Sequence, residues 1–215
     1  TLAPVVSEAM DMTVECDGDG NVTDLEAWLV DNGGASATDV CGGVSWTNDF
    51  DTLSDDCGAT GGATVVFTAT DACGNATNTS ATFTTEDTEA PAFTGAPMDQ
   101  SNQCEEAAYL AAAMDACSAV SIVEARTVIS DDACGNYEHL VLLTATDACG
   151  NSSEHQFTIV VLDTEAPEVV DAEGIENGGI LPVCADDIWG ALSIPEPLSL
   201  TAMDNCGADF TLEMT

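Results

Sequence analysis

The sequence predicts a mostly β protein made of tandem immunoglobulin-like β-sandwich modules, each with one short helix and each stapled by disulfides. Three observations predict this fold: an internal repeat, ten regularly spaced cysteines, and short apolar runs that alternate with polar residues between turn signals. Many short strands separated by turns about every ten residues favour an immunoglobulin-like sandwich.

The repeat divides the chain into modules. The segment TATDACGN occurs at 68–75 and again at 144–151, and DTEAP occurs at 87–91 and again at 163–167, so both pairs give a period of 76 residues. Self-similarity at a fixed period is the signature of a repeat architecture. We therefore expect three modules, called here the first, second and third repeat, at 1–90, 91–166 and 167–215. The third has only its first two cysteines, and we expect it to be incomplete.

Strands are predicted where apolar and polar residues alternate. The runs 63–70 and 80–87 in the first repeat, and 138–146 and 155–162 in the second, are each joined by DACGN and a few polar residues. Such pairs predict a β-hairpin that closes each module. A further strand around Val44–Asn48 is expected to run opposite to 63–70.

One helix is predicted near the start of each repeat, at 23–30, 105–114 and 186–193. Each segment begins with capping or acidic residues and carries one large aromatic residue. Thr23 and Glu26 fit a capping box, in which the two side chains bond to the free amides of the first turn. The aromatic residues are interpreted as core residues of their modules: Trp28, Tyr109 and Trp189.

The charge of the chain excludes several classes of partner. Asp and Glu number 39 against one basic residue, Arg126, and the formal net charge is −38. Nucleic acid and anionic membranes are therefore not expected partners, and no apolar stretch approaches the roughly 20 residues of a membrane span. The 45% of hydrophobic residues fall in regular short runs, which indicates folded modules rather than a disordered acidic chain.

The cysteines indicate disulfides. No C-x-x-C pair occurs and only two histidines are present, so the zinc-site patterns are absent. Buried free thiols in a cytosolic protein are the alternative, but they do not account for the regular spacing. Disulfides place the protein in an oxidising compartment, and we expect an extracellular or cell-surface location.

Strand direction suggests which cysteines meet. Cys57 and Cys73 flank one strand and should lie at opposite ends of the sandwich, because a strand rises about 3.3 Å per residue. Pairs at the same end are therefore predicted within each module. These pairs are Cys16–Cys57, Cys41–Cys73, Cys104–Cys134 and Cys117–Cys149. Cys184 and Cys206 are left for partners beyond residue 215 or for each other.

Carboxylates gather where one module ends and the next begins. Calcium binds six to eight oxygen ligands in flexible geometry, and such a cluster of carboxylates suits it. The alternative is that these acidic residues are exposed to solvent without a ligand, and that DTEAP is only a linker in which the proline fixes the direction of the chain. The predicted calcium ligands are Glu86, Asp87, Glu89, Asp115, Asp147, Asp163, Glu165 and Asp204.

Several of these motifs resemble a known family. VEC at 14–16, TATDACGN, and DTEAP at the module end are similar to hyalin-type (HYR-like) immunoglobulin-like repeats, and in particular to tandem modules of giant Bacteroidetes adhesins, including gliding-motility adhesins. The resemblance covers nearly all of the first repeat, the ends of the second and the first half of the third. It implies an exported, elongated cell-surface protein in which these modules act as spacers or adhesive segments, with no catalytic residue.

The function expected from the sequence is a non-catalytic stalk segment of a secreted adhesin or extracellular filament, with neighbouring modules of the same polypeptide as partners. No Ser-His-Asp or Cys-His spacing stands out, and Lys is absent, which argues against an enzyme. Two alternatives stay open: a calcium-dependent glycan-binding module that meets surface polysaccharide, and a filament subunit that polymerises with other fibre subunits by strand complementation. Asp51-Thr52-Leu53 resembles a Bacteroidetes O-glycosylation motif, which makes Thr52 a candidate modification site.

Overall fold

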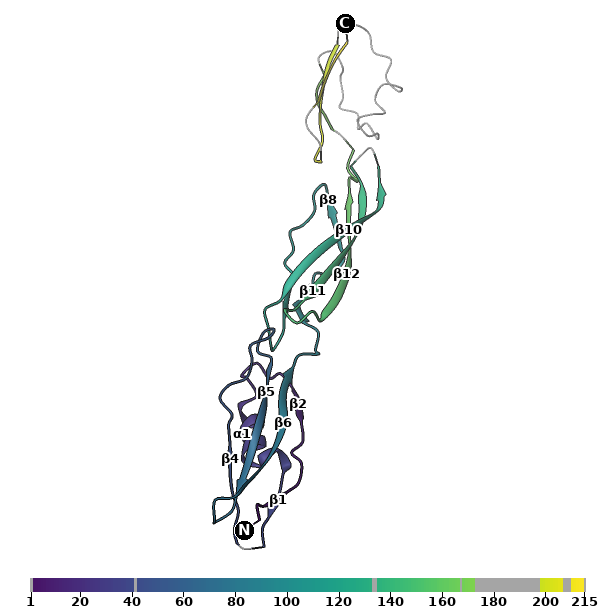
Figure 1. Cartoon of the computed structure of the whole chain (residues 1–215). Helices are drawn as coiled ribbons and strands as arrows, with labels where there is room; N and C mark the ends of the chain where they lie inside the picture. The colour runs from purple at the N-terminus through teal and green to yellow at the C-terminus, as the bar shows by residue number, and fades with distance from the viewer. Residues whose placement is uncertain are drawn as a thin grey trace. The chain divides into compact units, whose positions relative to one another are not determined.

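The computed structural model describes residues 2–40, 42–132, 135–166, 168–172, 198–206 and 210–214. The chain forms two compact units (Figure 1). The first unit contains residues 1–94 together with the short segments 113–122 and 145–153, and the second contains 95–112, 123–144 and 154–215. Each unit therefore takes residues from more than one stretch of the sequence. The repeat boundaries at 90 and 166 stay predictions.

The sheet of the first unit is built on a long hairpin. Strand β5 (Gly61–Thr70) pairs antiparallel with β6 (Ala76–Glu86), which confirms the predicted hairpin. Strand β4 (Ser45–Asn48) pairs antiparallel with β5, as predicted, and β2 (Met12–Glu15) pairs parallel with β6. The order is β2-β6-β5-β4, and a two-stranded ribbon of β1 (Val5–Val6) and β3 (Ala37–Thr38) lies outside it.

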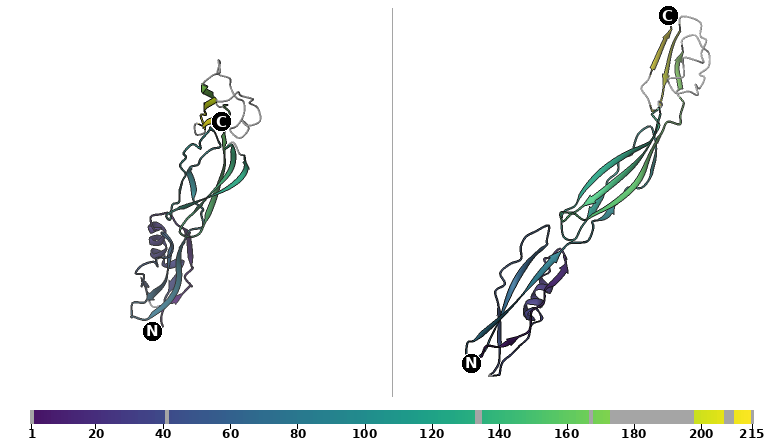
Figure 2. Two further views of the ribbon diagram at one scale, coloured as in Figure 1. Left: turned by 90° about the horizontal axis from the view of Figure 1, so that it is seen from above. Right: turned by 45° about the vertical axis from the view of Figure 1, so that its right-hand side comes forward.

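The core of the first unit forms on the inward face of this hairpin. Val65, Phe67, Ala81 and Phe83 are buried at alternate positions, as the period of a strand requires. Helix α1 (Val22–Val30) covers them, and Figure 2 shows the helix beside the strands of this unit. Trp28 contacts the rings of Phe67 and Phe83 at centroid distances of 5.2 and 5.6 Å, which confirms the predicted core role of Trp28. Its indole Nε1 donates a hydrogen bond to the Met10 carbonyl at 3.1 Å.

The capping-box prediction is wrong. The N-cap residue of α1 is Asn21, in the left-handed conformation at φ 51°, and it makes no side-chain capping hydrogen bond. Asp17 accepts hydrogen bonds from the backbone amides of Asp19 and Asn21, and Asn21 Nδ2 donates to the Glu15 carbonyl at 2.8 Å. This closed turn starts the helix one residue before Thr23. A 3₁₀ turn (Asn32–Gly34) follows the helix.

The second repeat forms a sheet of the same kind. Its order is β10 (Ser121–Asp131), β11 (Tyr137–Thr146), β12 (Ser152–Leu162) and β8 (Gln100–Gln103), with β8 parallel to β12 as β2 is to β6. The predicted strands 138–146 and 155–162 are thus confirmed as neighbours. Buried residues of β11 and β12 lie at positions equivalent to the first core: Val141, Leu143, Ala145, Phe157, Ile159 and Val161.

The helix predicted at 105–114 does not form. The structure has an extended segment there that ends in β9 (Ala112–Met114), which pairs with β7 (Ala92–Gly95). Tyr109 still packs on Phe157, at 4.9 Å, so an aromatic residue covers the core without a helix. The one basic side chain, Arg126, holds this segment by an ion pair with Glu106 at 2.7 Å.

Chain length explains the missing helix. The Cys104 amide bonds to the Leu162 carbonyl at the end of β12, whereas Ser118 bonds to Ala148, just before β12 begins. The chain from Cys104 to Cys117 must therefore run the length of an 11-residue strand, about 35 Å. Only 13 positions separate the two cysteines, and a helix of 13 residues would rise only about 20 Å. An extended chain is required.

Three strands of the third repeat are described: β13 (Glu168–Ala172), β14 (Leu198–Met203) and β15 (Phe210–Met214). They form an antiparallel sheet in that order. The helix predicted at 186–193, with Trp189, lies outside the described residues. The fold is therefore mostly β, with two β-sandwich-like modules and one short α-helix in the described part of the chain.

Candidate metal centre

Three disulfides join described residues, and each links one repeat to the next. They are Cys16–Cys117, Cys57–Cys149 and Cys104–Cys206, with Cα–Cα distances of 5.8, 5.2 and 4.6 Å. Their sequence separations are 101, 92 and 102 residues. If the cysteines of each repeat are counted in chain order, the first cysteine bonds to the second of the following repeat, and the third bonds to the fourth of the following repeat.

The predicted pairs Cys16–Cys57, Cys104–Cys134 and Cys117–Cys149 are therefore wrong. Strand direction correctly placed Cys16 and Cys57 at the same end of the sheet. Cys16 follows the last residue of β2 and Cys57 precedes the first residue of β5, and both of these residues lie beside the end of β6. The two cysteines do not bond to each other because each meets a cysteine from a loop of the second repeat.

The predicted pair Cys41–Cys73 is also contradicted. Cys73 carries a free, exposed thiol. Its predicted partner Cys41 lies outside the described residues, as do Cys134 and Cys184.

Close backbone packing surrounds the first two disulfides. The Ala59 amide donates to the Cys117 carbonyl at 2.9 Å. A Cβ atom at Gly58 would lie 2.5 Å from that carbonyl oxygen and 2.6 Å from the Cβ of Ser118, so no larger residue fits at Gly58 without movement. Asp115 organises the opposite loop, since its Oδ1 accepts hydrogen bonds from the amides of Cys117 at 2.8 Å and Ser118 at 3.0 Å.

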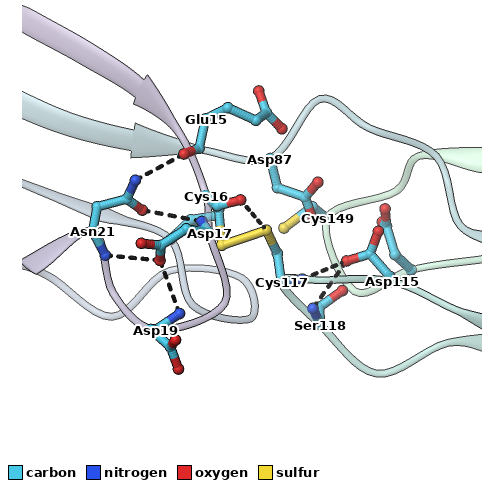
Figure 3. The surroundings of a disulfide bond; sticks show 12 residues. Glu15, Cys16, Asp17, Asp19, Asn21, Asp87, Asp115, Cys117, Ser118 and Cys149 are labelled. Atoms are coloured by element: carbon cyan, nitrogen blue, oxygen red, sulfur yellow. Dashed lines mark hydrogen bonds between the residues drawn. A yellow bond between two sulfur atoms is a disulfide. The ribbon is translucent and has the colours of Figure 1, made fainter. Parts of the chain in front are cut away.

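Asp87 lies in the middle of this arrangement, between the disulfides and Asp115 (Figure 3). One carboxylate oxygen each from Asp87 and Asp115 and the sulfur of Cys117 lie within 4.8 Å of one another. Both carboxylate oxygens of Asp87 are buried and have no hydrogen-bond partner among the described residues. A buried carboxylate without a partner is costly, so this group needs a cation or a proton.

The electrostatics of Asp87 reflect that environment. Burial raises the pKa of Asp87, and the negative charges of Asp115, Asp147 and Glu15 raise it further, while the Glu89 backbone amide acts in the opposite direction. For Asp147, burial also favours the neutral acid, but hydrogen bonds from the Asn151 side chain and nearby amides outweigh it and lower the pKa. Internal hydrogen bonds therefore stabilise the ionised form of Asp147, whereas the carboxylate of Asp87 has no such bonds among the described residues.

Glu15 is a neighbour that the sequence interpretation missed. It accepts hydrogen bonds from the Thr88 amide at 2.7 Å and from the Thr88 hydroxyl at 2.9 Å, and these bonds lower its pKa. Glu15 thereby ties the strand before the first cysteine to the DTEAP segment at the end of the same repeat. Its position directly before Cys16 was the available signal.

The same cluster recurs one repeat later, in the second unit. Asp163, Asp204 and the sulfur of Cys206 also place their ligand atoms within 4.8 Å of one another. Asp204 accepts from the Cys206 amide at 2.8 Å, as Asp115 does from Cys117. Gln103 takes the place of Glu15, and its side chain bonds to the Thr164 hydroxyl at 2.9 Å. The second cluster therefore has one carboxylate fewer in its surroundings.

The structure thus brings together four of the eight predicted ligands as two pairs, Asp87 with Asp115 and Asp163 with Asp204. Asp147 lies nearby and acts on Asp87 electrostatically. Glu86, Glu89 and Glu165 are exposed and are in neither cluster. Both cluster sulfurs belong to disulfides, so the available ligands for a hard cation are carboxylate oxygens.

Thr52 is exposed, and its glycosylation stays a prediction.

No protein-family model matches this chain, and no curated protein matches it. Among solved structures, the chain is similar to Drosophila N-cadherin EC1-4, with 12% identity, 75% of this chain and 50% of that chain covered, and a TM-score of 0.34. Human protocadherin-24 EC1-2 gives 16% identity, coverage of 76% and 100%, and a TM-score of 0.30. Protocadherin gamma B7 EC1-4 gives 10% identity, coverage of 99% and 76%, and a TM-score of 0.30.

The chain spans about half the length of the first solved structures it matches. The likeness is a distant one, to tandem cadherin repeats. Within the described part of the chain, no helix is both long and apolar enough to cross a membrane.

Proposed function

We propose that this chain is a non-catalytic structural segment of a secreted cell-surface adhesin or extracellular filament, in which calcium and disulfides together hold successive repeats. The resemblance to hyalin-type repeats of Bacteroidetes adhesins supports a role in surface attachment or gliding motility. The disulfides support an extracellular location, because such bonds persist in oxidising compartments. Partners in this proposal are neighbouring repeats of the same polypeptide.

The observation that carries the calcium part is the carboxylate of Asp87. It is buried, has no hydrogen-bond partner in the described part of the chain, and lies beside Asp115. The same pair recurs as Asp163 and Asp204, next to an equivalent disulfide. Calcium would neutralise the two carboxylates and hold the loop that carries Asp115 against the DTEAP segment, with water completing its six to eight ligands.

Calcium binding can be tested through stability. Extracellular calcium sites have affinities of about 10⁻⁴–10⁻³ M, so 10 mM calcium should stabilise the chain by about 1.4–2.7 kcal/mol per site. Urea unfolding of the full chain, with disulfides intact, is measured in metal-free buffer, in calcium and in magnesium at equal ionic strength. We expect a stabilisation by calcium that magnesium does not reproduce.

Two variants locate the site. Asp87→Asn removes the central carboxylate, and we expect it to abolish one of two binding events in calorimetric titration. Glu89→Gln is the matched control, since it removes one charge from the same segment but its side chain is exposed. The proposal fails if Asp87→Asn binds calcium as the wild type does. A stability that depends on pH but not on calcium would show that Asp87 is neutralised by a proton instead.

The two sites should differ in affinity. Glu15 adds negative charge near Asp87, whereas Gln103 occupies the equivalent position near Asp163. Because Coulomb attraction grows with the number of nearby carboxylates, we expect the Asp87 site to bind calcium more tightly. A Glu15→Gln variant should bring the two affinities closer together.

A further inference from the structure

The free thiol of Cys73 lies in a loop that its own hydrogen bonds hold in shape. Asp71 Oδ1 accepts from the amides of Cys73 at 2.8 Å and Asn75 at 2.9 Å, and Asn75 Nδ2 donates to Asp71 Oδ2 at 2.7 Å. Gly74 has φ 89°, a conformation that glycine adopts without strain. The loop therefore presents an exposed cysteine on an ordered support.

The loop at 147–151 has the same sequence, DACGN, and the same construction. Asp147 Oδ1 accepts from the Asn151 amide at 2.8 Å, and Asn151 Nδ2 donates to Asp147 Oδ2 at 2.9 Å. In this loop, however, the cysteine is not a free thiol, because Cys149 forms a disulfide with Cys57 of the preceding repeat. Asn151 Nδ2 also donates to the Asp87 carbonyl of that repeat at 3.0 Å.

The three disulfides between described residues follow one pattern, in which the first or third cysteine of a repeat bonds to the second or fourth cysteine, respectively, of the following repeat. The first cysteine of a repeat bonds to the second of the following repeat in Cys16–Cys117 and in Cys104–Cys206, and the third bonds to the fourth in Cys57–Cys149. Cys73 is the fourth cysteine of the first repeat. Under this pattern its partner is the third cysteine of a preceding repeat.

We propose that Cys73 forms a disulfide with the third cysteine of a further repeat of this kind, placed ahead of residue 1 in the same polypeptide. The loop 71–75 then makes the contacts that 147–151 makes, and the Asn75 amide reaches the carbonyl of the residue equivalent to Asp87. The partner's cysteine must be followed by glycine, because Gly58 lies too close to the facing backbone for a side chain. The inference rests on the disulfide connectivity and is independent of calcium.

Formation of the bond requires an oxidant. Two thiols, Cys73 and the partner cysteine, lose two protons and two electrons as the sulfur–sulfur bond forms. One molecule of a small disulfide such as oxidised glutathione accepts them and leaves as two thiols, through a mixed-disulfide intermediate.

A fusion protein tests the proposal. A copy of residues 1–87 is placed ahead of the full chain, so that its Asp87 is followed by Thr1-Leu2-Ala3-Pro4 in the same way that Thr88-Glu89-Ala90-Pro91 follows it in the native sequence. After oxidation with glutathione, non-reducing peptide mapping should link the added copy's third cysteine to Cys73. Cys73 should react with iodoacetamide in the unfused native chain and lose that reactivity in the fusion. Replacing the added copy's third cysteine by serine should restore it.

Two results would overturn the proposal. One is a fusion that keeps Cys16–Cys117 and Cys57–Cys149 in the original chain but leaves Cys73 a free thiol. The other needs no fusion: a Cys41–Cys73 disulfide in the oxidised 215-residue chain would show that the fourth cysteine is satisfied within its own repeat. Both readouts are made without calcium, so they are distinct from a failure of the calcium proposal.

Discussion

Removing the Cys57–Cys149 disulfide should strongly destabilise the protein. In the double variant Cys57→Ser/Cys149→Ser, the Cys16–Cys117 bond remains. The smallest loop that the Cys57–Cys149 bond closes in the wild type therefore runs from Cys57 back to Cys16, across the Cys16–Cys117 bond, and on to Cys149. It contains about 75 residues, for which the loss of loop-closure entropy corresponds to about 4.5 kcal/mol at 25 °C. Urea unfolding under non-reducing conditions measures this change, and the melting temperature should fall by about 9 °C or more.

The control for this experiment is Cys73→Ser. Cys73 has a free, exposed thiol, so its replacement should change the unfolding free energy by less than about 0.5 kcal/mol. The double variant should also expose no new thiols in denaturant. If it unfolds at the same urea concentration as the wild type, or if it releases two thiols elsewhere, then Cys57 and Cys149 are not partners and the reasoning is refuted.

Two further predictions concern the core and the buried carboxylate. Trp28→Ala should cost about 3–5 kcal/mol in urea unfolding because its ring fills the space over Phe67 and Phe83, whereas Val30→Ala, on the exposed side of the helix, should change little. Since the pKa of Asp87 is raised in the folded protein, its contribution to metal-free stability is present below the ordinary Asp value of 3.8 and is lost as pH rises through the raised pKa, so the stability of the wild type relative to Asp87→Asn should fall over that range. Asp87→Asn should remove this pH dependence; a wild-type-like profile in the variant would contradict the assignment.

The hairpins and the aromatic core could be predicted from the sequence because they follow from local patterns. Alternation of apolar residues fixed which face of β5 and β6 is buried, and the repeat carried the same pattern to β11 and β12. The carboxylate pairs Asp87–Asp115 and Asp163–Asp204 could also be found, because they follow from repeat ends meeting repeat starts.

The helix at 105–114 and the disulfide connectivity could not be predicted in the same way. The segment EEAAYLAAAM does have a helical pattern, but a helix of this length would be too short to reach from the Leu162 carbonyl to the loop after Cys117. For the cysteines, strand direction determines only which ends meet. Because the repeats carry cysteines at equivalent positions, strand direction is equally compatible with a disulfide inside one repeat and with a disulfide to the next repeat.

Disulfide mapping of the oxidised chain tests the central claim, that covalent bonds join successive repeats. The single basic residue makes trypsin unsuitable, but the many acidic residues allow digestion with proteases that cleave at Asp or Glu, followed by mass spectrometry without reduction. We expect linked peptides that join Cys16 to Cys117, Cys57 to Cys149 and Cys104 to Cys206. Peptides that join Cys16 to Cys57 and Cys117 to Cys149 would contradict the claim, since each repeat would then be closed on itself.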